Sequence, residues 1–171
     1  NFRFPEDNET QIYLLHKPGA TQSVIYMGHK SHKFDIDGDY FKSRVMNYSL
    51  GSGASARLFL NLREDKGYTY GVYSYFSGNK HKGQFTIFSS VKTDATDSAL
   101  VEILYELENY TTDGITSDEL RSTKSSMLNS DALKYESPMQ KIRFLNKILT
   151  YNLDNSFINK QSKILNSITK K

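Results

Sequence analysis

The segment 85–91 constrains the fold of this chain more than any other, because its side chains follow a pattern with a period of two residues. One set of alternate positions holds Phe85, Ile87, Ser89 and Val91, and the positions between them hold Thr86, Phe88 and Ser90. A period of two predicts a β-strand with one covered face. The Tyr- and Val-rich run 68–76 precedes it across a glycine-containing turn. The two segments therefore predict a β-hairpin.

Periodicity and turn residues predict the remaining elements. Two short strands are expected over 11–16 and 21–28, with a turn at Pro18-Gly19 between them. Ser52 can cap a helix that follows the Gly51–Gly53 break. Apolar spacing, caps and breakers predict helices at the following places: about 39–50, about 54–66, about 94–110, after Thr116, after Ser137, and weakly over 154–171.

Composition excludes several classes of function. The chain has 171 residues and no cysteine, which excludes disulfides, thiolate zinc sites and a cysteine nucleophile. Its formal net charge of +3 gives no electrostatic case for a nucleic-acid partner. No apolar run approaches the length of a membrane span, and no targeting segment follows Asn1. The cellular compartment, bacterial periplasm or cytoplasm, stays open.

A helical wheel for residues 54–66 places one charge on the apolar side. Arg63 falls inside the apolar arc, next to Phe59. A guanidinium there must be paired, reach out to solvent, or face a cleft. Two interpretations follow: a buried ion pair with an acidic residue, or an arginine that binds a ligand. Tyr70, seven residues later, begins the hairpin strand, so both side chains can emerge near one junction.

The other chemical motifs are weak. His29 and His32 have a spacing that can ligate a metal from a helix, but their context is basic and turn-like. No H-E-x-x-H or H-x-x-E-H string occurs, so the chain does not hold a peptidase-type zinc by itself. The stretch Gly51–Ser55 matches neither a phosphate-binding loop nor a nucleophile elbow. The Tyr-rich hairpin leaves a nucleic-acid-binding sheet as a distant alternative.

Two stretches taken together, Gly51–Phe59 and Leu62–Tyr73, resemble a known signature. The string L-R-E-x-K-G-x-x-Y-G, with an arginine and a tyrosine seven residues apart, is similar to the non-zinc half of the pitrilysin/insulinase-type zinc metallopeptidases. These include the mitochondrial processing peptidases. Residues 17–23 and 114–120 support the resemblance, which covers nearly the whole chain.

The resemblance implies an α+β fold: two layers, with a mostly antiparallel sheet and helices packed on one face. It implies one non-zinc C-terminal domain over residues 1–171, with 1–10 a linker remnant and with truncation at the C-terminus. Such halves close like a clamshell on a homologous half that binds the zinc, in the same polypeptide or in a separate subunit. Arg63 and Tyr70 match the two residues that this half supplies for catalysis and substrate binding.

The function implied is therefore that of a zinc endopeptidase's substrate-binding half, acting on extended, unfolded peptides. Amide hydrolysis develops negative charge on the carbonyl oxygen, and a fixed donor across the cleft stabilises it. Tyr70 is expected to be that donor, while Arg63 holds a substrate carbonyl. The isolated chain is expected to be inactive because the zinc motif is absent. A non-catalytic scaffold or peptide-binding relative of the same fold stays as the alternative.

Overall fold

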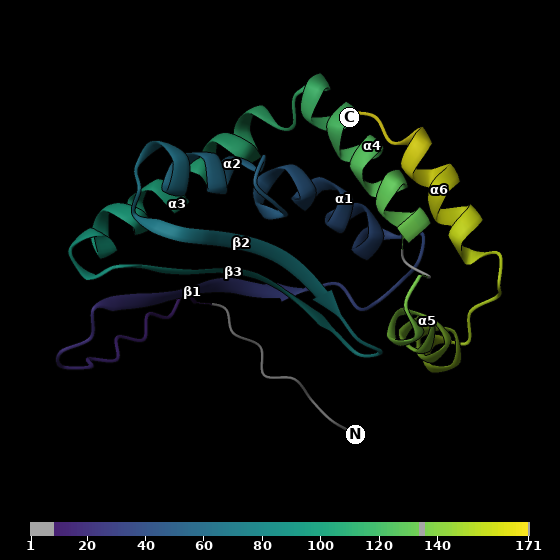
Figure 1. Cartoon of the computed structure of the whole chain (residues 1–171), viewed down its shortest axis with the longest axis horizontal. Coiled ribbons are helices and arrows are strands. Elements are labelled where there is room, and N and C mark those ends of the chain that lie inside the picture. Colours follow the sequence, from purple (N-terminus) through teal and green to yellow (C-terminus); the bar gives the residue numbers. More distant parts are fainter. Residues whose placement is uncertain (1–8, 134–135, 171) are drawn as a thin grey trace.

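Three antiparallel strands form the sheet on which the molecule is built (Figure 1). They are β1 (Gln22–Ser31), β2 (Thr69–Gly78) and β3 (Gly83–Lys92), in the spatial order β1-β3-β2. The structure, a computed structural model, describes residues 9–133 and 136–170. The predicted hairpin is confirmed: β2 and β3 pair from Gly78 opposite Gly83 onward.

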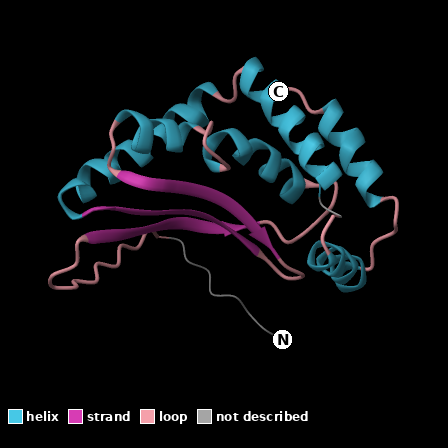
Figure 2. Cartoon of the chain, in the orientation of Figure 1, coloured by secondary structure: helices cyan, strands magenta, loops and turns pink. Residues whose placement is uncertain are grey.

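Most of the described helices lie on one side of this sheet, one lies beyond the end of the β2–β3 hairpin, and no described helix covers the other face (Figure 2). In chain order the helical elements are α1 (Asp39–Gly51), α2 (Arg57–Phe59), the π-helical segment η1 (Leu60–Asp65), the 3-10 turn η2 (Thr93–Ala95), α3 (Thr96–Asp113), α4 (Ser117–Leu133), α5 (Pro138–Tyr151) and α6 (Phe157–Ser167). The expected α+β fold, with an antiparallel sheet and helices on one face, is confirmed.

The alternation of β3 decides which side chains enter the core. Val91, Ser89 and Ile87 face the helices and are fully buried, together with Val72 of the neighbouring strand. Burying apolar surface of this kind contributes about 25 cal/mol per Å². The main core joins the sheet to α1, α2, η1 and α3 through the following residues: Leu50, Leu58, Phe59, Leu62, Val72, Phe85, Ile87, Val91, Ala99, Ile103 and Tyr110.

Helix α1 approaches the free edge of β2 closely. A Cβ on Gly51 would lie 2.1 Å from the Ser74 hydroxyl, so only glycine fits at this crossing. The Asn47 side chain donates to the Ser74 carbonyl at 2.8 Å and accepts from the Ser74 hydroxyl at 2.6 Å. The bond to the Ser74 carbonyl occupies a backbone acceptor that an additional strand would otherwise use for pairing with β2.

Three local predictions were wrong. Residues 11–16 form no strand: Ile12–Leu15 are exposed, and no described strand pairs with them, so their backbone groups have no ladder to join. Ser52 ends α1, donating its N–H to Tyr48, and does not open the next helix. That helix begins at Arg57, and after Phe59 it widens into η1 instead of continuing as an α-helix.

Candidate functional site

The short helix α2 is fixed to the turn between α3 and α4 by an arginine. Arg57 donates to both carboxylate oxygens of Glu119, at 2.6 and 2.8 Å, and to the Gly114 carbonyl at 2.9 Å. Its guanidinium also lies 4.8 Å from the centre of the Tyr110 ring. The hydrogen bonds from Arg57 lower the pKa of Glu119 to about 2, although partial burial opposes them. A planar two-point pair of this kind fixes orientation as well as distance.

The next turn, η1, has wider hydrogen bonding than an α-helix. Lys66 donates its N–H to the Asn61 carbonyl, five residues back, at 3.0 Å. The Asn61 amide nitrogen is held by Glu102 at 2.9 Å and by Glu106 at 2.8 Å, which ties this turn to α3. Single π-helical turns are rare and are frequent at functional sites. Arg57 and Asn61 thus anchor the stretch of chain that leads into Arg63.

Arg63 itself lies on the solvent side of η1. Its side chain is 45 % exposed, and its guanidinium lies 4.9 Å from the Phe59 ring centre. The nearest carboxylate is that of Glu64, at 3.5 Å. The interpretation of Arg63 as a buried ion pair is therefore wrong, because the wheel assumed α-helical spacing that η1 does not have. The ion pair that is largely buried belongs instead to Arg57, six residues earlier.

Tyr70 projects from an irregularity at the start of β2. Tyr70 and Gly71 together stand opposite one residue of β3, because the register shifts between Thr69 and Val72. The Thr69 hydroxyl lies 2.6 Å from the Ser90 carbonyl and accepts the Gly71 N–H at 3.1 Å. A β-bulge of this type redirects a side chain. The Tyr70 side chain is 86 % exposed, so its hydroxyl is open to a ligand.

Three residues connect the turn of Arg63 to the strand of Tyr70. Gly67, at φ +63°, lets the chain reverse, and the Tyr68 N–H donates to the Leu62 carbonyl at 2.9 Å. Both side chains thus flank one tightly bonded junction and both face solvent. Neither lines the groove that lies farther along β2, between that strand, α1 and α4. The sequence did not identify Arg57, Asn61 or Thr69 as supports; only the Glu119 capping pattern marked one of their partners.

The described residues provide no ligand set for a metal. Nowhere in 9–133 and 136–170 do three His, Cys, Asp or Glu side chains gather closely enough to hold an ion. His29 lies near the end of β1 and packs against Phe85 at 5.3 Å between ring centres, so the turn expected there is instead partly strand. The part of the chain that the structure describes therefore offers no ligand set for a zinc ion. Among the described helices, none is long and apolar enough to cross a membrane.

Comparison with known proteins identifies the family. Residues 1–127 match the family described as the peptidase M16 inactive domain. The chain belongs to the M16 peptidase family. It is 39 % identical over 129 residues to the uncharacterised zinc protease YmxG of Bacillus subtilis, covering 75 % of this chain and 31 % of that protein. It is 29 % identical over 136 residues to the non-peptidase homologue YmxG of Helicobacter pylori, covering 78 % of this chain and 31 % of that one.

Two solved structures agree with the fold. The M16 inactive-domain structure from Pseudomonas fluorescens superposes with a TM-score of 0.78 at 25 % identity, covering 88 % of this chain and 36 % of that one. A protease structure from Helicobacter pylori gives 0.80 at 20 % identity, covering 91 % and 37 %. The chain thus spans about a third of the length of the relatives named here. The resemblance in the Gly51–Tyr73 block is confirmed at the level of family and domain.

Proposed function

We propose that this chain is the substrate-binding, transition-state-stabilising half of a clamshell zinc endopeptidase that acts on unfolded peptides. The observation that carries the proposal is the junction of Arg63 and Tyr70, two exposed donors on a firmly anchored backbone. The zinc would be held by the homologous M16 half, in the same polypeptide or as a separate subunit. In this proposal the 171 residues act as one domain, with 1–10 as a linker.

Each of the two side chains would have a distinct role. Tyr70 would donate its hydroxyl proton in a hydrogen bond to the oxyanion that forms as the amide carbonyl becomes tetrahedral. Arg63 would bind a carbonyl of the substrate backbone, using guanidinium N–H groups that the long contact with Glu64 leaves available. The β-bulge at Tyr70 and the π-helical segment η1 fix the backbone at both residues before substrate binds, which lowers the entropy lost on binding.

An extended peptide would add to the sheet at β1. The other edge, on β2, is occupied: the Ser74 carbonyl accepts from Asn47 and the Phe76 carbonyl from the Tyr40 hydroxyl. The outer edge of β1 bonds to no other described strand over Gln22–Ser31. Main-chain hydrogen bonds along such an edge select extended, unfolded substrates. Val91 of β3 stands between Ser23 and Thr69, so the starts of β1 and β2 lie at one end of the sheet.

The test uses the intact protein with its zinc-bearing half and a quenched fluorescent peptide. Tyr70→Phe is expected to lower kcat by about 10²-fold, as removal of one oxyanion donor does. Arg63→Ala is expected to lower kcat/KM by about tenfold through weaker peptide binding. Tyr73→Phe, on the same strand, and Arg121→Ala, an exposed arginine on α4, are the matched controls. Cleavage unchanged in both Tyr70→Phe and Arg63→Ala would overturn the assigned roles.

A non-catalytic relative is the second candidate, and one observation favours it. The Helicobacter pylori relative is named a non-peptidase homologue, at a similar coverage of this chain. Under this alternative the fold binds an extended peptide or a protein partner without cleaving it. Zinc analysis of the intact protein separates the two candidates: bound zinc with peptide cleavage supports the enzyme, and the absence of both supports the scaffold.

A further inference from the structure

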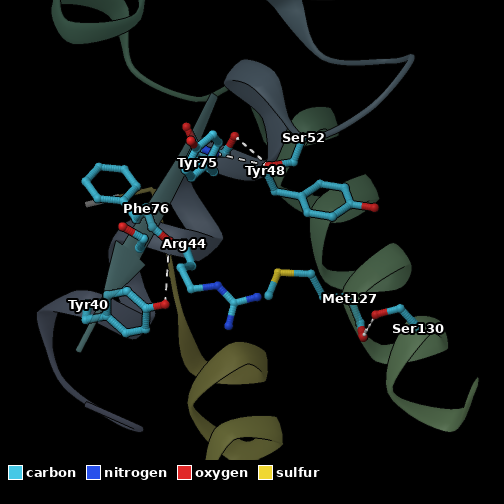
Figure 3. Close-up of a pocket in the computed structure, with 11 residues that line it drawn as sticks. Tyr40, Arg44, Tyr48, Ser52, Tyr75, Phe76, Met127 and Ser130 are labelled. Carbon is cyan, nitrogen blue, oxygen red and sulfur yellow. Dashed lines mark hydrogen bonds between the residues drawn. The ribbon is translucent and has the colours of Figure 1, made fainter. Parts of the chain in front are cut away.

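A groove lies between α1, the far end of β2 and α4, away from the junction of Arg63 and Tyr70 (Figure 3). Its volume is about 500 Å³, within the usual size of a small-ligand site. Aromatic and thioether side chains form its walls: Tyr40, Tyr48, Tyr75, Phe76 and Met127. The groove therefore offers a largely apolar surface next to an edge strand.

Arg44 is the charged residue that lines this groove. Figure 3 shows its side chain extending between Tyr40 on one side and Met127 on the other. Among the described residues it makes no ion pair, and it donates no hydrogen bond to any of them. Burial raises the pKa of the Tyr40 hydroxyl, and the nearby charge of Arg44 opposes that rise. An arginine left without an anion beside aromatic rings offers two parallel N–H groups to a carboxylate.

The surroundings of the groove favour a chain end over a continuous peptide. The Ser74 and Phe76 carbonyls on this edge of β2 already accept from side chains, so a peptide cannot extend the sheet here. At the end of β2, the Tyr151 hydroxyl of α5 donates to the carbonyl of Gly78, a residue that lines the groove, at 3.4 Å, so α5 lies beside this end of the strand. A ligand in the groove therefore meets apolar walls and the single cation Arg44, and it cannot rely on strand pairing with this edge of β2.

We propose that this groove binds the C-terminal residue of a peptide, with the free carboxylate on Arg44 and an apolar side chain against Tyr40 and Met127. The charge complementarity of carboxylate and unpaired guanidinium selects this occupant. The apolar walls contribute contact area of their own. The proposal concerns binding alone and does not depend on the catalytic roles of Arg63 and Tyr70.

The experiment measures fluorescence anisotropy of a labelled, alanine-rich peptide ending in leucine, titrated with the full chain. The free acid is expected to bind about tenfold more tightly than the same peptide with a C-terminal amide, because a charge-assisted hydrogen bond is lost. Arg44→Gln is expected to remove this preference. Lys42→Gln takes the same charge from the same helix, outside the groove lining, and is expected to keep it.

Three results would overturn the proposal. They are equal binding of acid and amide, a preference that survives Arg44→Gln, and equally tight binding of an amidated peptide that carries one internal glutamate. The last result would assign Arg44 to acidic side chains instead of chain ends. Arg44→Lys keeps the charge without the planar fork and should retain only part of the preference. Circular dichroism of each variant verifies that the fold is intact.

Discussion

Arg57 and Arg63 stand six residues apart on one helical segment, yet they meet opposite environments. The Arg57 side chain is 19 % exposed and its Glu119 partner 24 %. Three acceptor atoms satisfy its guanidinium, at 2.6 to 2.9 Å. Arg63 is 45 % exposed, and its contact with Glu64 is 3.5 Å long. One arginine is held by the fold through three hydrogen bonds, and the other keeps most of its donors.

The contrast shows how a chain separates support from function. A charge removed from water must recover its hydrogen bonds within the protein, so the buried arginine belongs to the architecture. An exposed arginine stays hydrated without a strong ion pair, so its N–H donors remain available to a ligand. The change from α2 to η1 between Arg57 and Arg63 is what gives two similar residues different directions.

The largest expected effect on stability comes from replacing Arg57, the less exposed of the two arginines. Arg57→Ala leaves the Glu119 carboxylate partly buried without its partner, and should lower the free energy of unfolding by about 3 kcal/mol. Urea unfolding measures it, with Arg121→Ala on the exposed face of α4 as control. Loss of less than about 1 kcal/mol, as for a surface pair, would remove the distinction between the two arginines.

Acid titration should locate the same pair. The pKa of Glu119 is lowered from its ordinary 4.5 to about 2, so the ionised carboxylate is favoured in the folded state. Its contribution is fully present above about pH 4.5 and is lost as pH falls toward 2, because the unfolded state then binds the proton more readily. Unfolding followed at a series of pH values checks this. In Glu119→Gln the free energy of unfolding should no longer fall with pH between about 4.5 and 2 on account of this group. An unchanged pH dependence in that variant would show that Glu119 does not contribute to it.

The sequence predicted the sheet and the position of the junction well. Alternation over 85–91 reports which face is buried, and this pattern is local, so β3 and its hairpin follow from it. Gly67 predicted the end of the helical segment, and the structure has η1 end before it and β2 begin after it. Local patterns and a specific motif were sufficient for these features.

Features that depend on distant contacts could not be predicted in the same way. The bonds from Asn61 to Glu102 and Glu106 join segments about forty residues apart, and no spacing rule connects them. The apolar run Ile12–Leu15 resembles a strand, but a strand forms only where a neighbour supplies hydrogen bonds. A π-helical turn has no residue pattern of its own, so the wheel for 54–66 placed Arg63 beside Phe59 but could not decide between a buried ion pair and an exposed guanidinium.

The connection between the two functional residues gives a smaller, more specific effect. Gly67→Ala should cost about 1 kcal/mol of stability, because φ is +63° and a Cβ is unfavourable there. Gly19→Ala is the matched control, with φ +74° and equally open space around it. Both variants should lose similar stability in urea, while only Gly67→Ala should reduce peptide cleavage by the intact protein. Equal activity of the two would show that the junction does not position Arg63 and Tyr70.

The smallest expected effect completes the comparison of the arginines. Arg63→Ala should change the free energy of unfolding by about 0.5 kcal/mol, since its ion pair is exposed and its contact with the Phe59 ring is solvated. The same urea experiment measures it beside Arg57→Ala. If Arg63→Ala destabilises the chain as strongly as Arg57→Ala, then Arg63 supports the fold and its proposed role toward a peptide loses its basis. A small loss of unfolding free energy would show that the fold does not depend on this guanidinium, as expected of a residue whose donors are available to a ligand.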